Sequence, residues 1–453
     1  MRAQKKPGDS RARLELQISR LKQVSYDAPC LFQDSATQSA SFRTKAGPAS
    51  AETAWQGAIT HQPDNSQWII VIRLIHTSDL HLDACYAEER LPAAFGNRRR
   101  QSLRDVLKRI LERAVEWPAD AVLIAGDLFE IDRISRDTVA FLQSSFENLG
   151  PVPVFIAPGN HDPYTTNSPY RTESWPSNVT IFSTPAWQRA DVEDISLTVH
   201  GFAFDSLDIS QNPFGSLQIP QDGRVHVALG HGSEMGSIPP GKDAYAPFRA
   251  TDATPPGLRY LALGHFHGYK QVPGPYDATV AYSGAPEGHG FGETGERYFL
   301  EVEIDEKEVR VRPVTGNRTV YVTFSMDCSE FTNSQQIVDA IREHPKPNGL
   351  AAVARVTLTG NNSPEWRHEI SAIRDALSDH FEYLKVVDAT VELEDYLFLA
   401  REHTSLGAFI AMLNAELDDT PDLGRRQMLL RAREVGLAAY RGRDLAIEGA
   451  EGE

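Results

Sequence analysis

The feature that most constrains the fold is a series of short apolar runs, each ending in a cluster of polar residues. The runs begin near residue 69, and helical or loop segments separate them: IIVIRLI, DAVLIAGD, VPVFIAPG, ISLTVHGFAF, VHVALGHG and LRYLALGHFHG. Short apolar runs without polar alternation are typical of strands that are buried on both faces. We therefore expect an α/β fold in which helices cover the faces of buried strands.

One helix is expected between the first two runs. The segment RRQSLRDVLKRILERAVEW repeats its apolar residues at intervals of three and four positions: Leu103, Val106, Leu107, Ile110, Leu111 and Ala114. This spacing puts all six side chains on one face of an amphipathic helix, which can then pack against the strands.

Composition limits the classes of partner. Lys and Arg number 45 against 62 Asp and Glu, a formal net charge of −17, so the chain is no polycation that coats nucleic acid. A contact with DNA or RNA must come from a local basic patch or from bound metal ions. Cys30, Cys85 and Cys328 form no CxxC pair, which argues against a disulfide framework or a thiolate zinc site and fits a cytoplasmic protein. No apolar run reaches the roughly 20 residues of a membrane span, so no membrane partner is expected.

The sequence divides into four expected parts. Residues 1–70 have weak periodicity and are predicted to be a poorly structured N-terminal extension, or else an over-called start with Val71 arising from a GUG codon. Residues 71–317 hold the apolar runs and form the expected catalytic domain. An α+β part is predicted over residues 318–400, and a helical segment over residues 401–453.

The polar clusters at the ends of the runs share a chemistry. They contain Asp79 and His81, Asp127, Asn160 and His161, His231, and finally His265 and His267. Each cluster follows a strand, so each should emerge at a carboxyl edge, where α/β sheets bind ligands. Carboxylates, an amide oxygen and imidazoles suit Mn²⁺, Fe²⁺ or Zn²⁺ and are too many for a single tetrahedral ion. Two ions that share one carboxylate account for the set.

A pair of metal ions predicts a reaction class. Two ions about 3.5–4 Å apart can hold a bridging hydroxide and clamp the oxygens of a phosphate ester. A histidine left over from metal binding is the natural general acid for the leaving oxygen. Each cluster alone has a plainer reading, since Asp79 could cap a turn and Gly-Asp is common turn chemistry. The ordered set of five favours the metal site.

In these motifs the chain resembles the calcineurin-like metallophosphoesterase superfamily, whose signature is D-x-H, GD, GNH(D/E), GH and GHxH in that order. The resemblance implies an α/β calcineurin-like metallophosphoesterase sandwich with a C-terminal α+β capping domain. It also implies that His161 is the general acid and that Glu130 orients it. The implied ligands are Asp79, His81, Asp127 and His267 for one metal, and Asp127, Asn160, His231 and His265 for the other.

The residues within and around the motifs are similar to those of the SbcD/YhaO-type DNA repair exonucleases. HTSDLHLD, VLIAGDLFE, YLALGHFHG and YSGAPEGHGFGETGERYFLEVEI carry this likeness, and the GDxxDRG motif of the related protein phosphatases is missing. The likeness implies a DNA exonuclease that depends on two Mn²⁺ ions, with endonuclease activity as a further expectation. It also implies an SMC-like ATPase of the SbcC/YhaN type as partner. A homodimer is one expected assembly. The alternatives are a small-molecule phosphodiesterase or phosphatase, and a DNA-end-binding scaffold subunit of the ATPase complex.

Three further segments bear on the substrate and the partner. The loop over residues 283–296, rich in glycine, is expected to be flexible and to approach the substrate. For the run Arg98 to Arg100 a solvated helix face is favoured over DNA contact. The basic C-terminal segment is expected to meet a partner coiled coil, and the nine histidines outside the motifs, for example His76, are assigned to the surface or the packed core.

Overall fold

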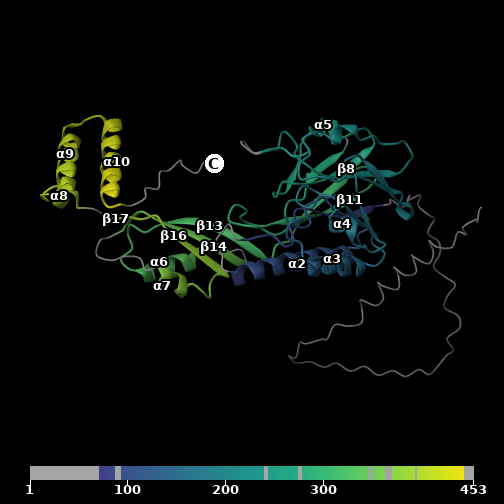
Figure 1. Cartoon of the computed structure of the whole chain (residues 1–453), viewed down its shortest axis with the longest axis horizontal. Coiled ribbons are helices and arrows are strands. Elements are labelled where there is room, and N and C mark those ends of the chain that lie inside the picture. Colours follow the sequence, from purple (N-terminus) through teal and green to yellow (C-terminus); the bar gives the residue numbers. More distant parts are fainter. Residues whose placement is uncertain are drawn as a thin grey trace, which may run out of the picture.

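The computed structural model describes residues 71–86, 93–238, 243–273, 278–345, 350–362, 370–392 and 395–442. The extension expected over residues 1–70 lies outside the described residues, as does the end of the C-terminal segment from residue 443. Figure 1 shows a two-sheet body, a smaller sheet beside it and a separate group of helices toward the C-terminus.

The first sheet contains six strands in the order β12-β11-β1-β2-β3-β4. Strands β1 to β4 are parallel, and β11 and β12 add to the β1 edge in antiparallel register. The bounds are Ile72–Thr77 for β1, Ala121–Ile124 for β2, Val154–Ile156 for β3, Val179–Ile181 for β4, Tyr298–Ile304 for β11 and Val309–Thr315 for β12.

The second sheet also contains six strands, in the order β5-β6-β7-β8-β10-β9. Its centre is parallel, and β5 and β9 pair in antiparallel register at the two edges. The bounds are Gln188–Val192 for β5, Leu197–Gly201 for β6, Val225–His231 for β7, Leu258–Gly264 for β8, Lys270–Gln271 for β9 and Thr279–Tyr282 for β10.

The two sheets face each other across one apolar core. Leu74 and Leu123 of the first sheet share this core with Val227 and Tyr260 of the second, and all four are fully buried. Alternate residues of the first sheet, such as Ile75, point to the opposite face because successive side chains of a strand alternate. The first sheet is therefore buried on both faces, as its continuous apolar runs predict.

The two long helices of this body cover the outer face of the first sheet. Helix α2 (Ala93–Glu116) and α3 (Arg136–Glu147) pack there, and all six apolar residues predicted for the face of α2 are buried. The outer face of the second sheet is covered by loops and short turns, where the rings of Phe214 and Phe248 stack at 3.9 Å. The short helical elements of this body are α4 (Pro169–Thr172), η1 (Glu193–Ile195), η2 (Phe214–Ser216) and α5 (Ala250–Ala253).

A separate α+β part follows β12. It consists of a parallel sheet in the order β13-β14-β16, one face of which packs on α6 and α7, and a two-stranded sheet of β15 and β17. The bounds are Thr319–Asp327 for β13, Ser334–Glu343 for α6, Ala351–Thr359 for β14, Asn361–Asn362 for β15, Ile370–Ala376 for α7, Tyr383–Asp388 for β16 and Val391–Glu392 for β17. The expected α/β sandwich with an additional C-terminal domain is confirmed.

Three helices end the described chain: α8 (Tyr396–Leu399), α9 (Ser405–Asp419) and α10 (Leu423–Tyr440). They form small apolar clusters of their own, for example that of Leu399, Ile410 and Leu437. Within the described ranges, no helix combines the length and the apolar character that crossing a membrane requires.

Helix α2 joins the sandwich to the C-terminal sheet, because it runs beneath both in Figure 1. Its N-terminal turn places Phe95 in a cluster with Tyr321 and Val353 of that sheet. Arg99, expected on a solvated face, is instead fully buried, and its Nη2 lies 2.5 Å from Oε1 of the equally buried Glu287. The expectation was wrong for Arg99, because the loop that carries Glu287 and Gly288 covers this side of the helix.

The buried pair of Arg99 and Glu287 gives a test of this junction. Arg99→Met leaves the Glu287 carboxylate buried without its counter-charge, and we expect a loss of about 3–5 kcal/mol in the free energy of unfolding, measured by urea denaturation. Arg98→Met is the matched control, because Arg98 is exposed and 3.5 Å from Glu382, a surface pair worth about 1 kcal/mol or less. Equal losses in the two variants would contradict the buried role of Arg99.

Candidate metal centre

Loops at the carboxyl ends of five strands build the site. Asp79 and His81 follow β1, Asp127 follows β2, and Asn160 and His161 follow β3. His231 is the last residue of β7, and His265 and His267 follow β8, so the two sheets each supply one side. The loops after β1 and β2 are joined by backbone hydrogen bonds, among them those from the amide of Asp79 to Gly126 and from that of His81 to Asp127.

The backbone is strained where it carries these side chains. Seven described residues other than glycine have a positive φ, and four of them belong to the predicted site: Asp79, His81, Asp127 and His265. A left-handed conformation costs of order 1–3 kcal/mol for such residues and persists only where the surroundings hold it in place. The strain aims the side chains away from the strand direction and toward one another.

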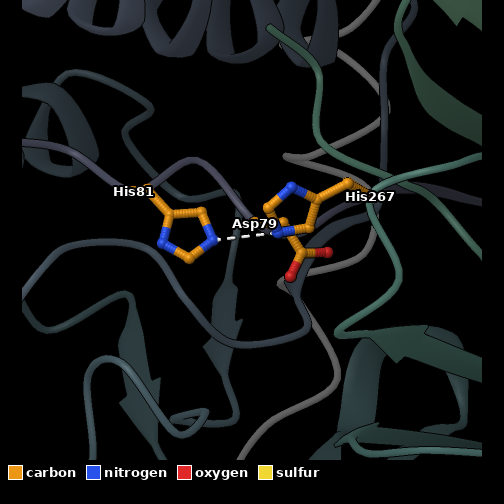
Figure 2. A group of neighbouring side chains, drawn as sticks. All are labelled: Asp79, His81 and His267. Atoms are coloured by element: carbon orange, nitrogen blue, oxygen red, sulfur yellow. Dashed lines mark hydrogen bonds between the residues drawn. The ribbon is translucent and has the colours of Figure 1, made fainter. Parts of the chain in front are cut away.

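The first half of the site is formed by Asp79, His81 and His267, which Figure 2 shows converging from two different loops. Nδ1 of His81 lies 2.7 Å from Oε1 of Glu130, and Nδ1 of His267 lies 2.5 Å from Oε1 of Glu293. A carboxylate accepts hydrogen bonds only, so each Nδ1 carries the proton and each Nε2 presents a lone pair. These two Nε2 atoms face each other at 3.2 Å.

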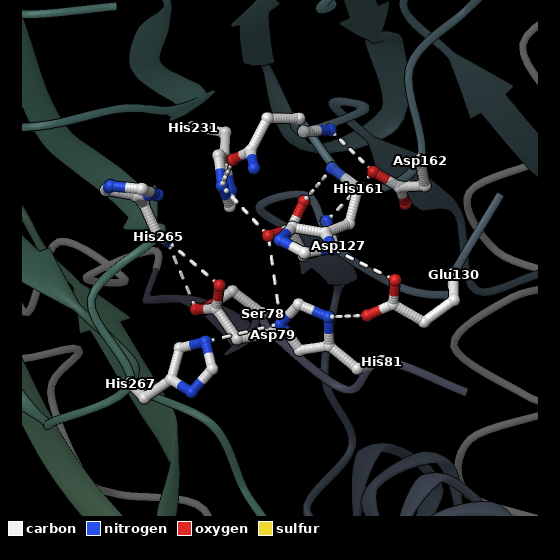
Figure 3. Close-up of polar contacts among 12 residues, drawn as sticks. Ser78, Asp79, His81, Asp127, Glu130, His161, Asp162, His231, His265 and His267 are labelled. Atoms are coloured by element: carbon white, nitrogen blue, oxygen red, sulfur yellow. Dashed lines mark hydrogen bonds and ion pairs between the residues drawn. The ribbon is translucent and has the colours of Figure 1, made fainter. Parts of the chain in front are cut away.

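The second half surrounds Asp127 (Figure 3). Nδ1 of His231 donates to the carbonyl of Ala125 at 2.8 Å, which leaves the Nε2 lone pair directed at Oδ2 of Asp127, 3.2 Å away, and at Oδ1 of Asn160, 3.0 Å away. Oδ2 of Asp127 is also 3.7 Å from Nε2 of His81, so this carboxylate lies between the two halves.

The donor set fits divalent cations. Lone pairs and carboxylate oxygens that converge in a buried volume repel one another unless a positive charge lies between them. The described residues offer four groups that could hold a metal ion, and two of them contain predicted ligands alone: Asp79 with His81 and His267, and Asp79 with Asp127 and His231. Oxygen and imidazole ligands without a thiolate are the set that Mn²⁺, Fe²⁺ and Zn²⁺ accept.

Without a cation, protons would carry the positive charge. His231 and His81 hold the pKa of the Asp127 carboxyl below its usual range, against the opposing effect of burial. The charge of Asp127 in turn raises the pKa of His231 to about 9, although burial alone would lower it. The site therefore stabilises positive charge next to Asp127.

His161 lies beside the two halves and differs from the other histidines in exposure. Its side chain is 45% exposed, and its ring Nδ1 lies 3.0 Å from Oε2 of Glu130. Glu130 thus bridges His81 and His161, one through each carboxylate oxygen. The hydrogen bond to Glu130 raises the pKa of His161 to about 9, more than partial burial lowers it. A protonated imidazole in reach of solvent can donate a proton to a leaving oxygen.

Asp162 fixes the loops after β2 and β3 relative to each other. Its fully buried carboxylate accepts hydrogen bonds from the amides of Asp127, Leu128 and Gly159, at 2.6–2.9 Å, and from the hydroxyl of Tyr170 at 2.7 Å. The last residue of the GNHD motif is therefore a support for Asp127 and lies outside the two ligand groups.

The loops also approach each other through glycine. A Cβ atom on Gly264, at the end of β8, would lie 1.9 Å from the carbonyl oxygen of Ala125 and 2.9 Å from Nδ1 of His231. The two sheets meet at this point, where residue 264 has no room for a side chain.

His265 is the predicted ligand that contacts the site mainly through its backbone. Its backbone amide donates to both carboxylate oxygens of Asp79, at 3.0 and 3.2 Å, and its ring centroid is 5.2 Å from that of His231. The structure thus brings Asp79, His81, Asp127, Asn160, His231 and His267 together through side-chain atoms, with Glu130 and His161 beside them, whereas His265 adjoins the group mainly through its backbone.

Two residues of the site, His289 and Glu293, were missed in the sequence. Besides the contact of Glu293 with His267, the ring of His289 lies 5.1 Å from that of His81 and 5.6 Å from that of His267. The sequence assigned His289 to the surface or the core with the other histidines, and the structure places its ring beside two predicted ligands. The available signal was the GHG of PEGHGFGETG, an imidazole within a glycine-rich loop close in sequence to the GHxH motif.

Comparison with known proteins gives a consistent picture. The model of the calcineurin-like phosphoesterase family matches residues 72–269. The metallophosphoesterase YhaO of Bacillus subtilis (strain 168) is 27% identical over 363 residues, which cover 77% of this chain and 87% of that protein. The DNA double-strand break repair protein Mre11 of Methanopyrus kandleri is 23% identical over 260 residues, 52% of this chain and about half (54%) of its own length.

The role of Glu130 can be tested in metal-free protein. Glu130→Gln removes the carboxylate charge and the strong hydrogen bond, so we expect the pKa of His161 to fall from about 9 toward its ordinary value of 6.5, as measured by NMR titration of ¹³C-labelled histidine. His200 is the internal control, since burial keeps its pKa at about 4 and Glu130 is not among the causes. A His161 pKa that stays near 9 in the variant would show that Glu130 is not its main partner.

Proposed function

We propose that this chain is a calcineurin-like metallophosphoesterase of the SbcD/YhaO type and that it acts in DNA repair as an Mn²⁺-dependent DNA exonuclease. The observation that carries the proposal is the half-exposed His161, which lies beside two groups of inward-facing ligands and shares Glu130 with one of them. Such an arrangement supplies a proton donor next to a site for cations, which is what cleavage of a phosphodiester needs.

Each residue has a distinct role in the proposed reaction. Asp79, His81, Asp127 and His267 would hold one Mn²⁺, and Asp127, Asn160, His231 and His265 the other. When bound, the cations supply positive charge against the phosphate oxygens and lower the pKa of the attacking water. His161 donates a proton from its ring to the oxygen that leaves, and Glu130 keeps the ring oriented and protonated through Nδ1.

The choice of DNA as substrate is supported by the relatives and by the extent of the likeness. The match to YhaO covers 77% of the chain and therefore extends beyond the sandwich, and the Mre11 relative carries DNA double-strand break repair in its name. The net charge of −17 means that the cations and local arginines have to attract the phosphates.

The proposed partner is an SMC-like ATPase that binds the C-terminal helices. Four large apolar side chains of α9 and α10 are between 53% and 78% exposed: Met412, Leu423, Met428 and Tyr440. Apolar side chains so placed can lie against a partner helix. Several arginines of α10 are engaged within the helical group, since Arg433 donates to Asn414 and lies over the ring of Tyr396, and Arg425 pairs with Glu416. This favours an apolar contact over binding of DNA by the same helix.

Hydrolysis assays with Mn²⁺ test the proposal. We expect wild type to release nucleotides from linear DNA, His161→Ala to be slower by roughly 10²–10⁴-fold, and Asp127→Ala to be inactive because both cation sites lose a ligand. Bis(4-nitrophenyl) phosphate, whose leaving group needs no proton, should be far less sensitive to His161→Ala. His403→Ala, a change at an exposed histidine in the C-terminal helical part, is the matched control and should retain wild-type activity.

The other outcomes identify the alternatives. Turnover of the small diester without cleavage of DNA would indicate a small-molecule phosphodiesterase. Binding of DNA ends without turnover of either substrate would indicate a scaffold subunit of the ATPase complex. An equal loss of activity toward DNA and toward the small diester in His161→Ala would contradict the role of His161 as a general acid.

A further inference from the structure

The loop that follows β10, residues 284–295, connects the metal centre to the C-terminal sheet. We call it the bridging loop. It was expected to be flexible and to approach the substrate. Its first part, residues 284–288, is buried, and side chains along it point to two different neighbours. His289 and Glu293 meet the metal centre, whereas Glu287 and Phe291 meet α2 and the C-terminal sheet.

On the side of the metal centre, Glu293 is held at both oxygens. Oε1 accepts from Nδ1 of His267 at 2.5 Å, and Oε2 accepts from the backbone amide of His289 at 3.0 Å. Arg297 approaches the same carboxylate at 3.9 Å and donates to the backbone carbonyl of His267 at 2.8 Å. Nε2 of His289 donates to the carbonyl of Asp79 at 3.4 Å, so the loop contacts both sides of the first ligand group.

On the other side, the loop is fixed by the C-terminal sheet and α2. Glu287 accepts from Arg99 and from the backbone amide of Arg318 at 2.8 Å. Phe291 is 3% exposed and packs with Phe95, Tyr321 and Val353. The backbone amide of Gly295 donates to the carbonyl of Tyr321 at 3.1 Å, next to a β-bridge between Thr294 and Tyr321.

A carboxylate on Nδ1 of a histidine determines whether Nε2 can bind a metal. It holds the proton on Nδ1, keeps the lone pair on Nε2 and stops the ring from turning. The side chain of His267 is 31% exposed, and Glu293 holds its Nδ1 at 2.5 Å. The position of Glu293 depends in turn on a loop that also contacts α2 and the C-terminal sheet.

We propose that Glu293 is the positioning residue for His267 and that the C-terminal sheet sets the position of Glu293 through Phe291. The C-terminal domain thereby controls cation affinity in the half of the site formed by Asp79, His81 and His267. A displacement of that domain pulls on the bridging loop and loosens His267, whereas Asp127, Asn160 and His231 are held by contacts within the sandwich. The inference rests on the cation site of the proposed function and is independent of the substrate.

The experiment is a titration of the full chain with Mn²⁺, in which binding is measured by calorimetry and by the EPR signal of free Mn²⁺. We expect two sites in wild type. Glu293→Ala should weaken one of them by about 10–100-fold and leave the other unchanged. Glu293→Gln keeps an acceptor oxygen for Nδ1 and should weaken the same site less. Glu296→Gln is the matched control, since Glu296 is exposed and contacts the hydroxyl of Tyr298, and should bind both ions as wild type does.

The dependence on the C-terminal domain is tested by Phe291→Ala, which touches no ligand. We expect it to weaken the same site as Glu293→Ala, by a smaller factor. Phe291→Leu retains most of the apolar contact and should give an intermediate affinity, which keeps the test valid if the alanine variant fails to fold. Affinity unchanged in both Phe291 variants would overturn the control by the C-terminal domain.

The result for Glu293 separates this inference from the proposed function. Two unchanged sites in Glu293→Ala would overturn the positioning role while leaving DNA cleavage by the wild type intact. A wild type that binds no Mn²⁺ would overturn the metal centre itself, and the role of Glu293 with it.

Discussion

The convergence of imidazole lone pairs and carboxylate oxygens on one buried volume is the constraint on which the rest of the structure depends. Each histidine of the inner group uses Nδ1 to donate away from the centre, His81 to Glu130, His231 to Ala125 and His267 to Glu293, so that Nε2 is left facing inward. Such an arrangement is unfavourable without a cation and is only maintained because the surroundings are rigid. The strained loops, the buried carboxylate of Asp162 and the two-sheet core all serve to hold it.

Much of this could be predicted from the sequence, for a physical reason. A parallel strand that is buried on both faces shows itself as an uninterrupted apolar run, and the carboxyl ends of such strands lie at one edge. Polar residues directly after the runs, as in Asp79 and Asp127, therefore had to lie near one another. Their pairing across two sheets was not visible, because apolar runs do not indicate which strands are neighbours.

The parts that were missed depend on contacts between segments without periodicity. Glu293 lies in a loop whose conformation is set by buried contacts of Glu287 and Phe291 with other domains, and no local pattern predicts such contacts. The same applies to Arg99, which looks like one member of a basic run on a helix. Only the approach of Glu287, from 188 positions further along the chain, makes it a buried ion pair instead of a candidate for binding DNA.

The close approach at Gly264 has a consequence for the geometry of catalysis. Because the carboxylate of Asp127 lies between His81 of the first sheet and His231 of the second, the distance between the sheets at this point sets the distance between these ligands. A side chain at Gly264 would lie within 1.9 Å of Ala125 and would force the sheets apart. The glycine thus keeps the ligands of the two sheets close together, and a pair of bound cations would take its separation from the main chain.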